Sequence, residues 1–398
     1  MEFFYLTFCI LVELFVKNCQ AMSESFERRA FLNKLFLSGT TLISAPIAAI
    51  SKSMKTETEA QEKEKNPILY TRALGFQWDT LDPFLFCVHH EDKFPKGNDQ
   101  MGPPSNYLAG RHMGDDFIIK DGFRMYHGGV VPGFPGHPHR GFETVTVVRE
   151  GFVDHADSLG AAGRYGQGDV QWMTAGKGVQ HSEMFPLLRK EKENPMELFQ
   201  IWLNLPKRNK MVDAHFKMLW SESISKYVHT DAQGKTTKVE VIAGTLGKYT
   251  APAPPPNSWA ADPTNEVAIW NIRMEPGAKW TLPKASAGIN RTIYYYIGDS
   301  ISMAGHKISK YHAVVVKSDQ DILIENGDTK GRILILQGKP INEPVISYGP
   351  FVMNTKEEIN QAFEDYHRTQ FGGWPWPKSD QVHDRNAGRF ALHADGKK

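Results

Sequence analysis

Cysteine and net charge are both scarce in this sequence, and each shortage excludes a class of protein. There are three cysteines, and because Cys9 and Cys19 fall in an N-terminal segment discussed below, Cys87 is left without a disulfide partner. Folding therefore does not depend on an oxidising compartment, and we expect Cys87 to be a small buried apolar residue. Lys and Arg number 46 against 45 Asp and Glu, which provides no basic field for nucleic acid or an anionic membrane.

Two groups of catalytic motif are also missing. Ser158 and Ser182 lack the Gly-x-Ser-x-Gly elbow of serine hydrolases. No glycine pattern of the Walker or Rossmann type stands between a strand and a helix. The sequence therefore indicates neither a serine hydrolase nor a nucleotide-binding enzyme.

The composition is that of a globular protein larger than one average domain. The chain has 398 residues, of which 41% are hydrophobic and 23% are charged, so two domains plus additional segments are expected. Glycine and proline are plentiful, at 34 and 24 residues, which favours an all-β protein with many turns over a helical bundle.

The N-terminus resembles an export signal. Arg28 and Arg29 precede Phe31 and Leu32, and a weakly apolar stretch then ends in small residues near Ala49. This order is similar to a bacterial twin-arginine signal and predicts a leader over residues 1–50, with translation starting at Met22. A periplasmic protein follows from this interpretation. The alternatives are an amphipathic helix in a cytoplasmic protein, or an apolar N-terminal anchor that holds the protein at a membrane.

The remaining sequence reads mainly as strands. Short apolar runs with β-branched residues, separated by Gly, Asp and Pro, recur over 67–205 and again over 239–338. Residues 207–238, between these two regions, are polar and we expect them to be partly helical. The proline-rich stretch 251–256 cannot enter a central strand.

One helix stands out near the C-terminus. Residues 356–368 carry Ile359, Ala362 and Phe363 at helical spacing, and Asn354 or Thr355 can serve as the N-cap. We therefore predict an all-β fold of two tandem, jelly-roll-like β-barrels with a short C-terminal helix. The predicted segments are a leader (1–50), a flexible linker (51–66), an N-terminal metal-binding domain (67–210), a C-terminal domain without metal (211–376) and a tail (377–398).

Two pairs of residues carry the predicted chemistry. His137 and His139 form one pair with a spacing of two, and His181 and Glu183 form the other. Residues two apart on a strand point to the same face, so neighbouring strands can aim three imidazoles and one carboxylate at one space. Such a set suits a single divalent transition metal and leaves positions open for water, dioxygen or substrate.

Other residues compete for roles near this site. Glu143 is a fourth ligand if the strand is regular; if a bulge at Gly141 turns it away, we expect it to accept a hydrogen bond from the free N–H of a ligand histidine. Arg140 pairs either with a carboxylate at the rim or in an ordinary surface ion pair. We expect loop or surface positions for His89, His90, His306 and His312, and barrel packing for Trp172 and Met173.

Long segments resemble the pirin family of the cupin superfamily. They are FPGHPHRGFETVTVV (134–148), GDVQWMTAGKGVQHSEMF (168–185), LFQIWLNLP (198–206), PINEPVISYGPFVMNTKEEINQAFEDY (340–366) and GGWPW (372–376). The resemblance covers nearly all of the chain from Arg72 to Phe390.

The resemblance implies a bicupin with metal in the N-terminal barrel only. It implies His137, His139, His181 and Glu183 as the ligands, and it gives Glu143 no ligand role. The metal in the family is usually iron, and Cu, Mn, Ni, Zn and Co are the alternatives. Quercetinase activity is credited to pirins, and nuclear members act as iron-dependent transcriptional co-regulators.

Three functions use these same ligands. The first is a dioxygenase that takes O2 and a polyphenol or enol such as quercetin, with Glu183 as the catalytic base. The second is a non-catalytic metal- or redox-sensing protein, and the third is a bicupin that uses metal for stability alone. We expect a monomer that binds no nucleic acid and contacts a membrane only if the leader is retained.

Overall fold

The computed structural model describes residues 66–397. The predicted leader (1–50) and most of the predicted linker (51–66) lie outside the described residues. Within the described part of the chain, no helix has the length and apolar character needed to cross a membrane.

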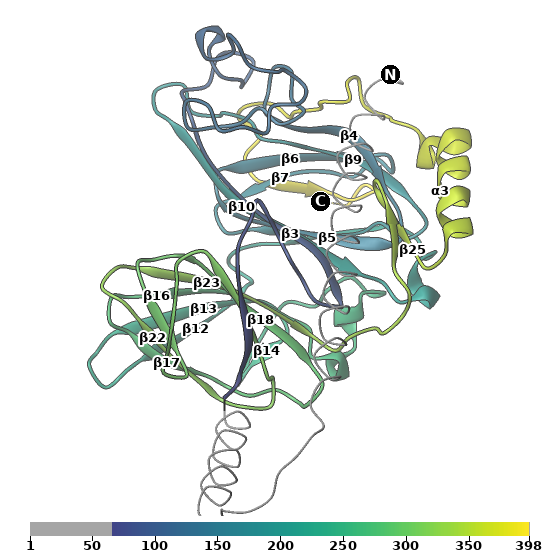
Figure 1. Cartoon of the computed structure of the whole chain (residues 1–398). Helices are drawn as coiled ribbons and strands as arrows, with labels where there is room; N and C mark the ends of the chain where they lie inside the picture. Colours follow the sequence, from purple (N-terminus) through teal and green to yellow (C-terminus); the bar gives the residue numbers. More distant parts are fainter. Residues whose placement is uncertain (1–65, 398) are drawn as a thin grey trace, which may run out of the picture. The chain divides into compact units, whose positions relative to one another are not determined.

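The first barrel is built from two antiparallel sheets that face each other (Figure 1). The six-stranded sheet has the order β11-β8-β5-β10-β3-β2, and the five-stranded sheet has the order β26-β7-β6-β9-β4. The strands of the six-stranded sheet are β2 (Gln77–Trp78), β3 (Phe84–Phe94), β5 (Phe142–Glu150), β8 (Val170–Thr174), β10 (Asn194–Asn204) and β11 (His215–Leu219). The strands of the five-stranded sheet are β4 (Gly133–His139), β6 (Phe152–Asp157), β7 (Ala162–Gly166), β9 (Val179–Met184) and β26 (Phe390–Leu392).

The second barrel repeats this plan with a seven-stranded and a four-stranded sheet. The seven-stranded sheet contains β1 (Ile68–Ala73), β12 (Ser225–Thr230), β13 (Thr236–Ala243), β16 (Ala268–Met274), β18 (Asn290–Ile297), β21 (His312–Val316) and β23 (Gly331–Gly338). The four-stranded sheet contains β17 (Lys279–Leu282), β19 (Ile301–Met303), β20 (His306–Ile308) and β22 (Ile322–Asn326). Short strands outside these sheets are β14 (Thr245–Leu246), β15 (Tyr249–Thr250), β24 (Ile346–Tyr348) and β25 (Phe351–Met353). The predicted all-β architecture with two barrels is confirmed.

Strand pairing crosses the domain boundaries that the sequence predicts. β1 lies at the start of the predicted N-terminal domain, yet it pairs with β21 of the second barrel. β26 lies in the predicted tail (377–398), and it pairs with β7 of the first barrel. Each barrel therefore receives one strand from the far end of the chain.

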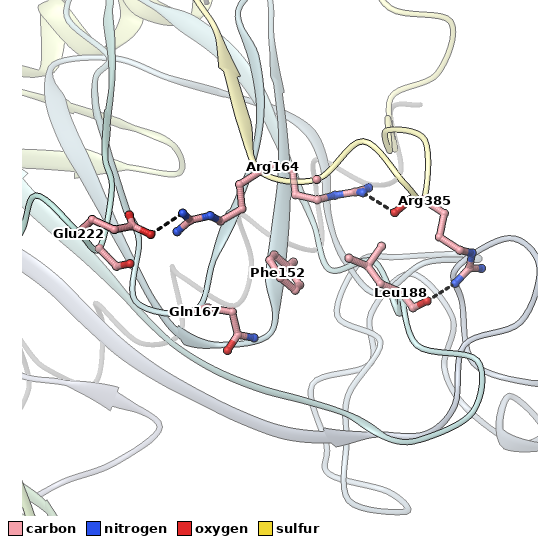
Figure 2. Close-up of a pocket in the computed structure, with 9 residues that line it drawn as sticks. Phe152, Arg164, Gln167, Leu188, Glu222 and Arg385 are labelled. Atoms are coloured by element: carbon pink, nitrogen blue, oxygen red, sulfur yellow. Dashed lines mark hydrogen bonds and ion pairs between the residues drawn. The ribbon is translucent and has the colours of Figure 1, made fainter.

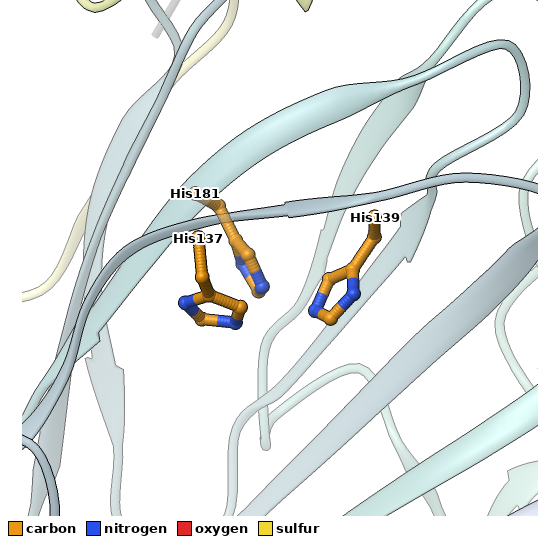
Figure 3. Close-up of side chains that lie close together, drawn as sticks. All are labelled: His137, His139 and His181. Carbon is orange, nitrogen blue, oxygen red and sulfur yellow. The ribbon is translucent and has the colours of Figure 1, made fainter. Parts of the chain in front are cut away.

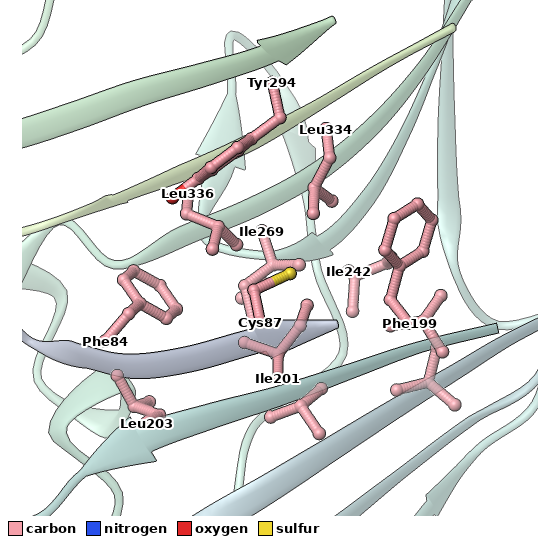
Figure 4. Packing of buried hydrophobic residues seen from close by; sticks show 14 of the residues in the cluster. Phe84, Cys87, Phe199, Ile201, Leu203, Ile242, Ile269, Tyr294, Leu334 and Leu336 are labelled. Carbon is pink, nitrogen blue, oxygen red and sulfur yellow. The ribbon is translucent and has the colours of Figure 1, made fainter. Parts of the chain in front are cut away.

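A shared core joins the two barrels. Alternate residues of β3, β5 and β10 face it, among them Cys87, Val145 and Ile201, all fully buried (Figure 4). Ile269 and Leu334 of the second barrel pack into the same cluster. Cys87 is a buried free thiol, as the sequence predicts. One face of the six-stranded sheet is thus used for packing, which leaves the other face for the barrel interior.

The helix α3 (Lys356–Thr369) confirms the predicted helix and its cap. Thr355 accepts a hydrogen bond from the backbone N–H of Glu358, whose side chain returns a bond to the cap, so the two form a capping box. The partly helical character expected for 207–238 is wrong. That stretch contains β11, β12 and the first residues of β13, apart from a single short turn of 3₁₀ helix at Lys207–Asn209. Its polar residues lie on strands with one exposed face.

Glu143 of β5 lies at the junction of the barrels, away from the histidines. Its side chain is fully buried and accepts hydrogen bonds from the hydroxyls of Thr174, at 2.6 Å, and Ser258, at 2.5 Å. Glu143 therefore does not contact the histidines, in agreement with the absence of a ligand role that the resemblance implies, and its expected role as an acceptor for a ligand histidine is wrong. Gly141, with φ of +89°, lies between the end of β4 and the start of β5, so the chain turns there and does not form a bulge within one strand. Burial raises the pKa of Glu143 from 4.5 to about 7, and the Ser258 and Thr174 hydroxyls only partly oppose this rise.

The C-terminal segment should be needed for stability because its backbone carbonyls accept hydrogen bonds from the buried guanidinium of Arg164. This buried guanidinium pairs with Asp154 at 2.6 Å and donates to the carbonyls of His383, Asp384 and Arg385. Removing residues 378–398 should lower the free energy of unfolding by on the order of 3 kcal/mol or more, measured by chemical denaturation. Removing only 394–398, which leaves β26 in place, should change it little. Equal effects of the two truncations would contradict this role.

The pKa of Glu143 predicts a pH dependence of stability. The folded protein holds the Glu143 proton up to about pH 7, whereas the unfolded chain releases it near 4.5, so stability falls as pH rises through this window. Glu143→Gln should remove that loss, which amounts to about 3 kcal/mol. Urea denaturation at several pH values would measure it. Glu150→Gln, at the exposed end of the same strand, is the control, and a Glu143→Gln profile parallel to that of the wild type would refute the assignment.

Candidate metal centre

Three of the four predicted ligands meet inside the first barrel. β4 and β9 pair antiparallel with His137 opposite His181, and His139 lies two residues further along β4 on the same face. Nitrogen atoms of the three rings all lie within 4.8 Å of one another (Figure 3). The spacing of two residues therefore predicted correctly that these histidines lie together. The cluster has the composition and the size to hold one metal ion.

Glu183 lies beside this cluster and is held by the opposite sheet. Its Oε2 is 3.9 Å from His181 Nε2. Thr146 donates to Oε1 at 2.8 Å, and Gln200 donates to Oε2 at 2.9 Å. The phenol of Tyr165 lies 3.4 Å from Oε1. The structure thus brings Glu183 next to His181 with its carboxylate already hydrogen-bonded, and its role as a fourth ligand stays a prediction.

The electrostatics of the histidines favour the neutral, metal-binding form. Burial lowers the pKa of His137 to about 4, and it lowers the pKa values of His139 and His181 well below the usual range. Neutral imidazole carries the lone pair that a metal requires. His137 Nδ1 contacts the carbonyl of Pro135 at 2.9 Å, which leaves Nε2 to face the cluster.

Buried ring nitrogens of the histidines that lack a hydrogen-bond partner show that these residues are suited to bind a metal ion. Both ring nitrogens of His181 and Nδ1 of His139 are buried without a hydrogen-bond partner. Leaving such groups unsatisfied costs about 1–3 kcal/mol each, and a bound cation would remove this cost for a nitrogen that binds it. The side chains present therefore suit a divalent transition ion in this space.

A fourth histidine near the cluster, His155, was not predicted from the sequence. His155 of β6 pairs across the sheet with Glu183, and its ring centroid lies 5.5 Å from that of His181. Its Nε2 contacts Asp157 at 3.3 Å, and Phe216 stacks on it at 5.0 Å. His155 and Asp157 have the same spacing of two as the ligand pairs, so that spacing could have drawn attention to them.

Other predicted residues have different outcomes. The loop position expected for His89 and His90 is wrong, because β3 extends through both and buries them. His89 lies 3.3 Å from Glu197, and His90 lies 2.9 Å from the Tyr126 hydroxyl. On strands of the second barrel, His306 is exposed and His312 is half-buried. Trp172 and Met173 are buried in packing. Arg140 pairs with the carboxylate of Asp365 at 2.9 Å.

A separate hollow of about 410 Å³ lies apart from the histidines, on the outer side of the five-stranded sheet (Figure 2). Its arginines are already engaged, since Arg164 pairs with Asp154, Arg389 with Glu222, and Arg385 donates to the carbonyl of Leu188. The arginines that line the hollow are therefore held by partners within the protein.

Comparison with known proteins supports the same interpretation. Residues 70–203 match the family described as Pirin, and residues 269–372 match the Pirin C-terminal cupin domain. Human pirin is 38% identical over 264 residues, which cover 65% of this chain and 83% of the human protein. A Pseudomonas aeruginosa protein with the provisional name quercetin 2,3-dioxygenase is 34% identical over 237 residues, covering 59% of this chain and 78% of that protein.

A solved structure shows the same architecture. Quercetin 2,3-dioxygenase from Acinetobacter baumannii matches with a TM-score of 0.57 and 27% identity, covering 77% of this chain and 96% of that protein. With both domain patterns present in order along the chain, the two barrels are cupin domains and the protein belongs to the pirin family.

Proposed function

We propose that this protein is a metal-dependent dioxygenase of flavonols such as quercetin, with iron as its metal. The observation that carries the proposal is the buried cluster of His137, His139 and His181 with Glu183 beside it. Similarity to proteins named quercetin 2,3-dioxygenase supports the substrate class.

The residues divide the work between binding and proton transfer. The three imidazoles, with Glu183 as a fourth donor, would hold the ion, which when bound supplies Lewis acidity and one-electron chemistry toward dioxygen. Burial raises the pKa of Glu183, which makes its carboxylate a better proton acceptor for an enol hydroxyl. Thr146 and Gln200 fix the position of that carboxylate, so that the proton has a defined destination.

A non-catalytic metal- or redox-sensing protein is the second candidate. The observation that favours it is that each oxygen of the Glu183 carboxylate already accepts a hydrogen bond, from Thr146 and from Gln200 respectively. A carboxylate so engaged can serve to shape the site without accepting a proton. Turnover separates the two candidates.

Oxygen consumption with quercetin tests the proposal. Glu183→Gln should reduce turnover at least about a hundredfold, because it removes the general base. Metal analysis of the same preparation should show an ion still present, since three histidines remain. Glu143→Gln, a buried carboxylate of the same barrel that does not face the cluster, is the matched control and should keep full activity.

The histidines provide the second arm of this test. His139→Ala should lose most of the metal and, with it, the activity. Full metal content in His139→Ala would contradict the site, whereas equal rates in Glu183→Gln and wild type would remove Glu183 from the base role. A wild-type protein that is fully loaded with iron and consumes no oxygen with quercetin would favour the sensing candidate.

We also propose that the protein is exported to the periplasm, on the basis of the Arg28–Arg29 pair and the apolar stretch that follows it. The twin-arginine route carries proteins that are already folded, which suits a protein loaded with metal before export.

Replacing both arginines with lysine should trap the protein in the cytoplasm, since that route recognises the paired arginines. Cell fractionation followed by immunoblotting would measure the distribution. Lys34→Gln, in the same segment, is the control and should leave export intact. Periplasmic accumulation of the doubly substituted protein would contradict the leader assignment.

A further inference from the structure

The six-stranded sheet presents two cross-strand rows of side chains to the metal centre. Each row takes one residue from each of five strands in register, and the alternate residues face the core shared with the second barrel. The first row is Phe86, Trp202, Thr144, Met173 and Phe216, and the second row is Val88, Gln200, Thr146, Gln171 and Met218. The two rows carry different chemistry.

Trp202 of the first row is the centre of an aromatic platform. Its ring lies between Phe86, at a centroid distance of 4.8 Å, and Phe142, at 4.3 Å. The ring of His139 meets it nearly edge-on at 5.4 Å. Phe142 is fully buried, whereas Phe86 and Trp202 are only half-buried, so the platform keeps accessible surface beside a predicted ligand.

Two polar groups on this platform have no partner. Trp202 Nε1 and Thr144 Oγ1 are both buried without a hydrogen bond, and these two residues are direct cross-strand neighbours. An indole N–H can only donate, so it needs an oxygen acceptor. In contrast, Thr146 and Gln200 of the second row are engaged by Glu183. Gln171 of the second row also has an unpartnered amide nitrogen, but it is the first row that carries unpartnered groups next to His139.

We propose that Trp202 and Thr144 form a recognition subsite for a planar aromatic substrate that carries a ring carbonyl. The platform packs against the aromatic ring, and the carbonyl oxygen accepts hydrogen bonds from the Trp202 N–H and the Thr144 hydroxyl. Trp202 is then a specificity-determining residue that selects carbonyl-bearing rings at the metal centre. This subsite deepens the proposed function and rests on it for the location of the substrate.

The alternative occupant of these donors is ordered water. Water would satisfy the N–H equally for any ligand, whereas a subsite makes the N–H matter only for ligands with the carbonyl. Quercetin and catechin share their hydroxyl pattern, but catechin lacks both the ring carbonyl and the C2–C3 double bond of quercetin. A subsite predicts a loss of binding in the Trp202 and Thr144 variants that is confined to quercetin, whereas water predicts the same effect on both ligands.

Calorimetric binding to the zinc-loaded protein without oxygen tests the subsite, because a redox-inert ion prevents turnover. Trp202→Phe keeps a ring and removes the N–H, and it should weaken quercetin binding about fivefold while leaving catechin binding unchanged. Thr144→Val should weaken quercetin binding about threefold with the same selectivity. Trp202→Leu removes the platform and should weaken both ligands about tenfold.

Trp220→Phe, at a tryptophan outside both rows, is the matched control and should bind both ligands as the wild type does. Unchanged quercetin binding in Trp202→Phe, or equal weakening of both ligands, would overturn the subsite, as would no measurable binding of quercetin to the wild type. Failure of the proposed dioxygenase function would give a different result from failure of the subsite. Trp202-dependent binding without oxygen consumption by the iron-loaded protein would leave the subsite standing and remove the dioxygenase.

Discussion

The histidine cluster of the candidate metal centre depends on the antiparallel register of β4 and β9. With His137 opposite His181, the pleat turns His139 and Glu183 to the same interior face. A shift of one residue would turn the side chains of the slipped strand to the other face of the sheet. Gly133, with φ of +132°, allows the close approach at the start of β4, because a Cβ atom there would lie 2.4 Å from the Glu183 carbonyl. Register and close approach together set the spacing of the ligands.

The two faces of the six-stranded sheet explain why the interior of the first barrel holds polar side chains beside the histidine cluster. The outer face of that sheet packs on the second barrel through Cys87, Val145 and Ile201. This frees its inner face to hold polar side chains such as Thr146 and Gln200. In the second barrel the interior is filled by a cluster of apolar residues that includes Trp270, Ile293 and Ile335. That filled interior has packing in place of donors, which fits a supporting role.

Local patterns predicted the parts of the site that lie along one strand. A spacing of two on extended backbone was sufficient for His137, His139 and His181, and the sequence around Thr355 was sufficient for the cap of α3. Contacts between the two sheets were not predictable, because they depend on which strands face each other. Trp202 and Tyr165 read as ordinary strand residues, and their relation to His139 and Glu183 emerges only from the closed barrel.

The predictions from the sequence were wrong where tertiary structure overrode a local sequence pattern. His89 and His90 stand beside acidic residues and read as a loop, yet β3 continues because β10 pairs along its whole length. The polar stretch 207–238 read as partly helical, but β8 and β13 provide edges for β11 and β12. Glu143 shares a face with the ligands in a straight strand, and the turn at Gly141 breaks that relation. In the first two cases strand pairing overrode composition, and in the third a turn interrupted the strand.

The C-terminal segment shows how distant sequence holds the ligand strands in place. Arg140, directly after His139, pairs with Asp365 of α3 and lies over the ring of Phe371 at 4.6 Å. Gln180, directly before His181, donates to the carbonyl of Gln370 and accepts from the Tyr366 hydroxyl. Both ligand strands are thus anchored from outside the barrel by one helix and the turn that follows it. Since Arg140 and Gln180 directly adjoin His139 and His181, the same C-terminal segment restrains both strands that carry the histidines.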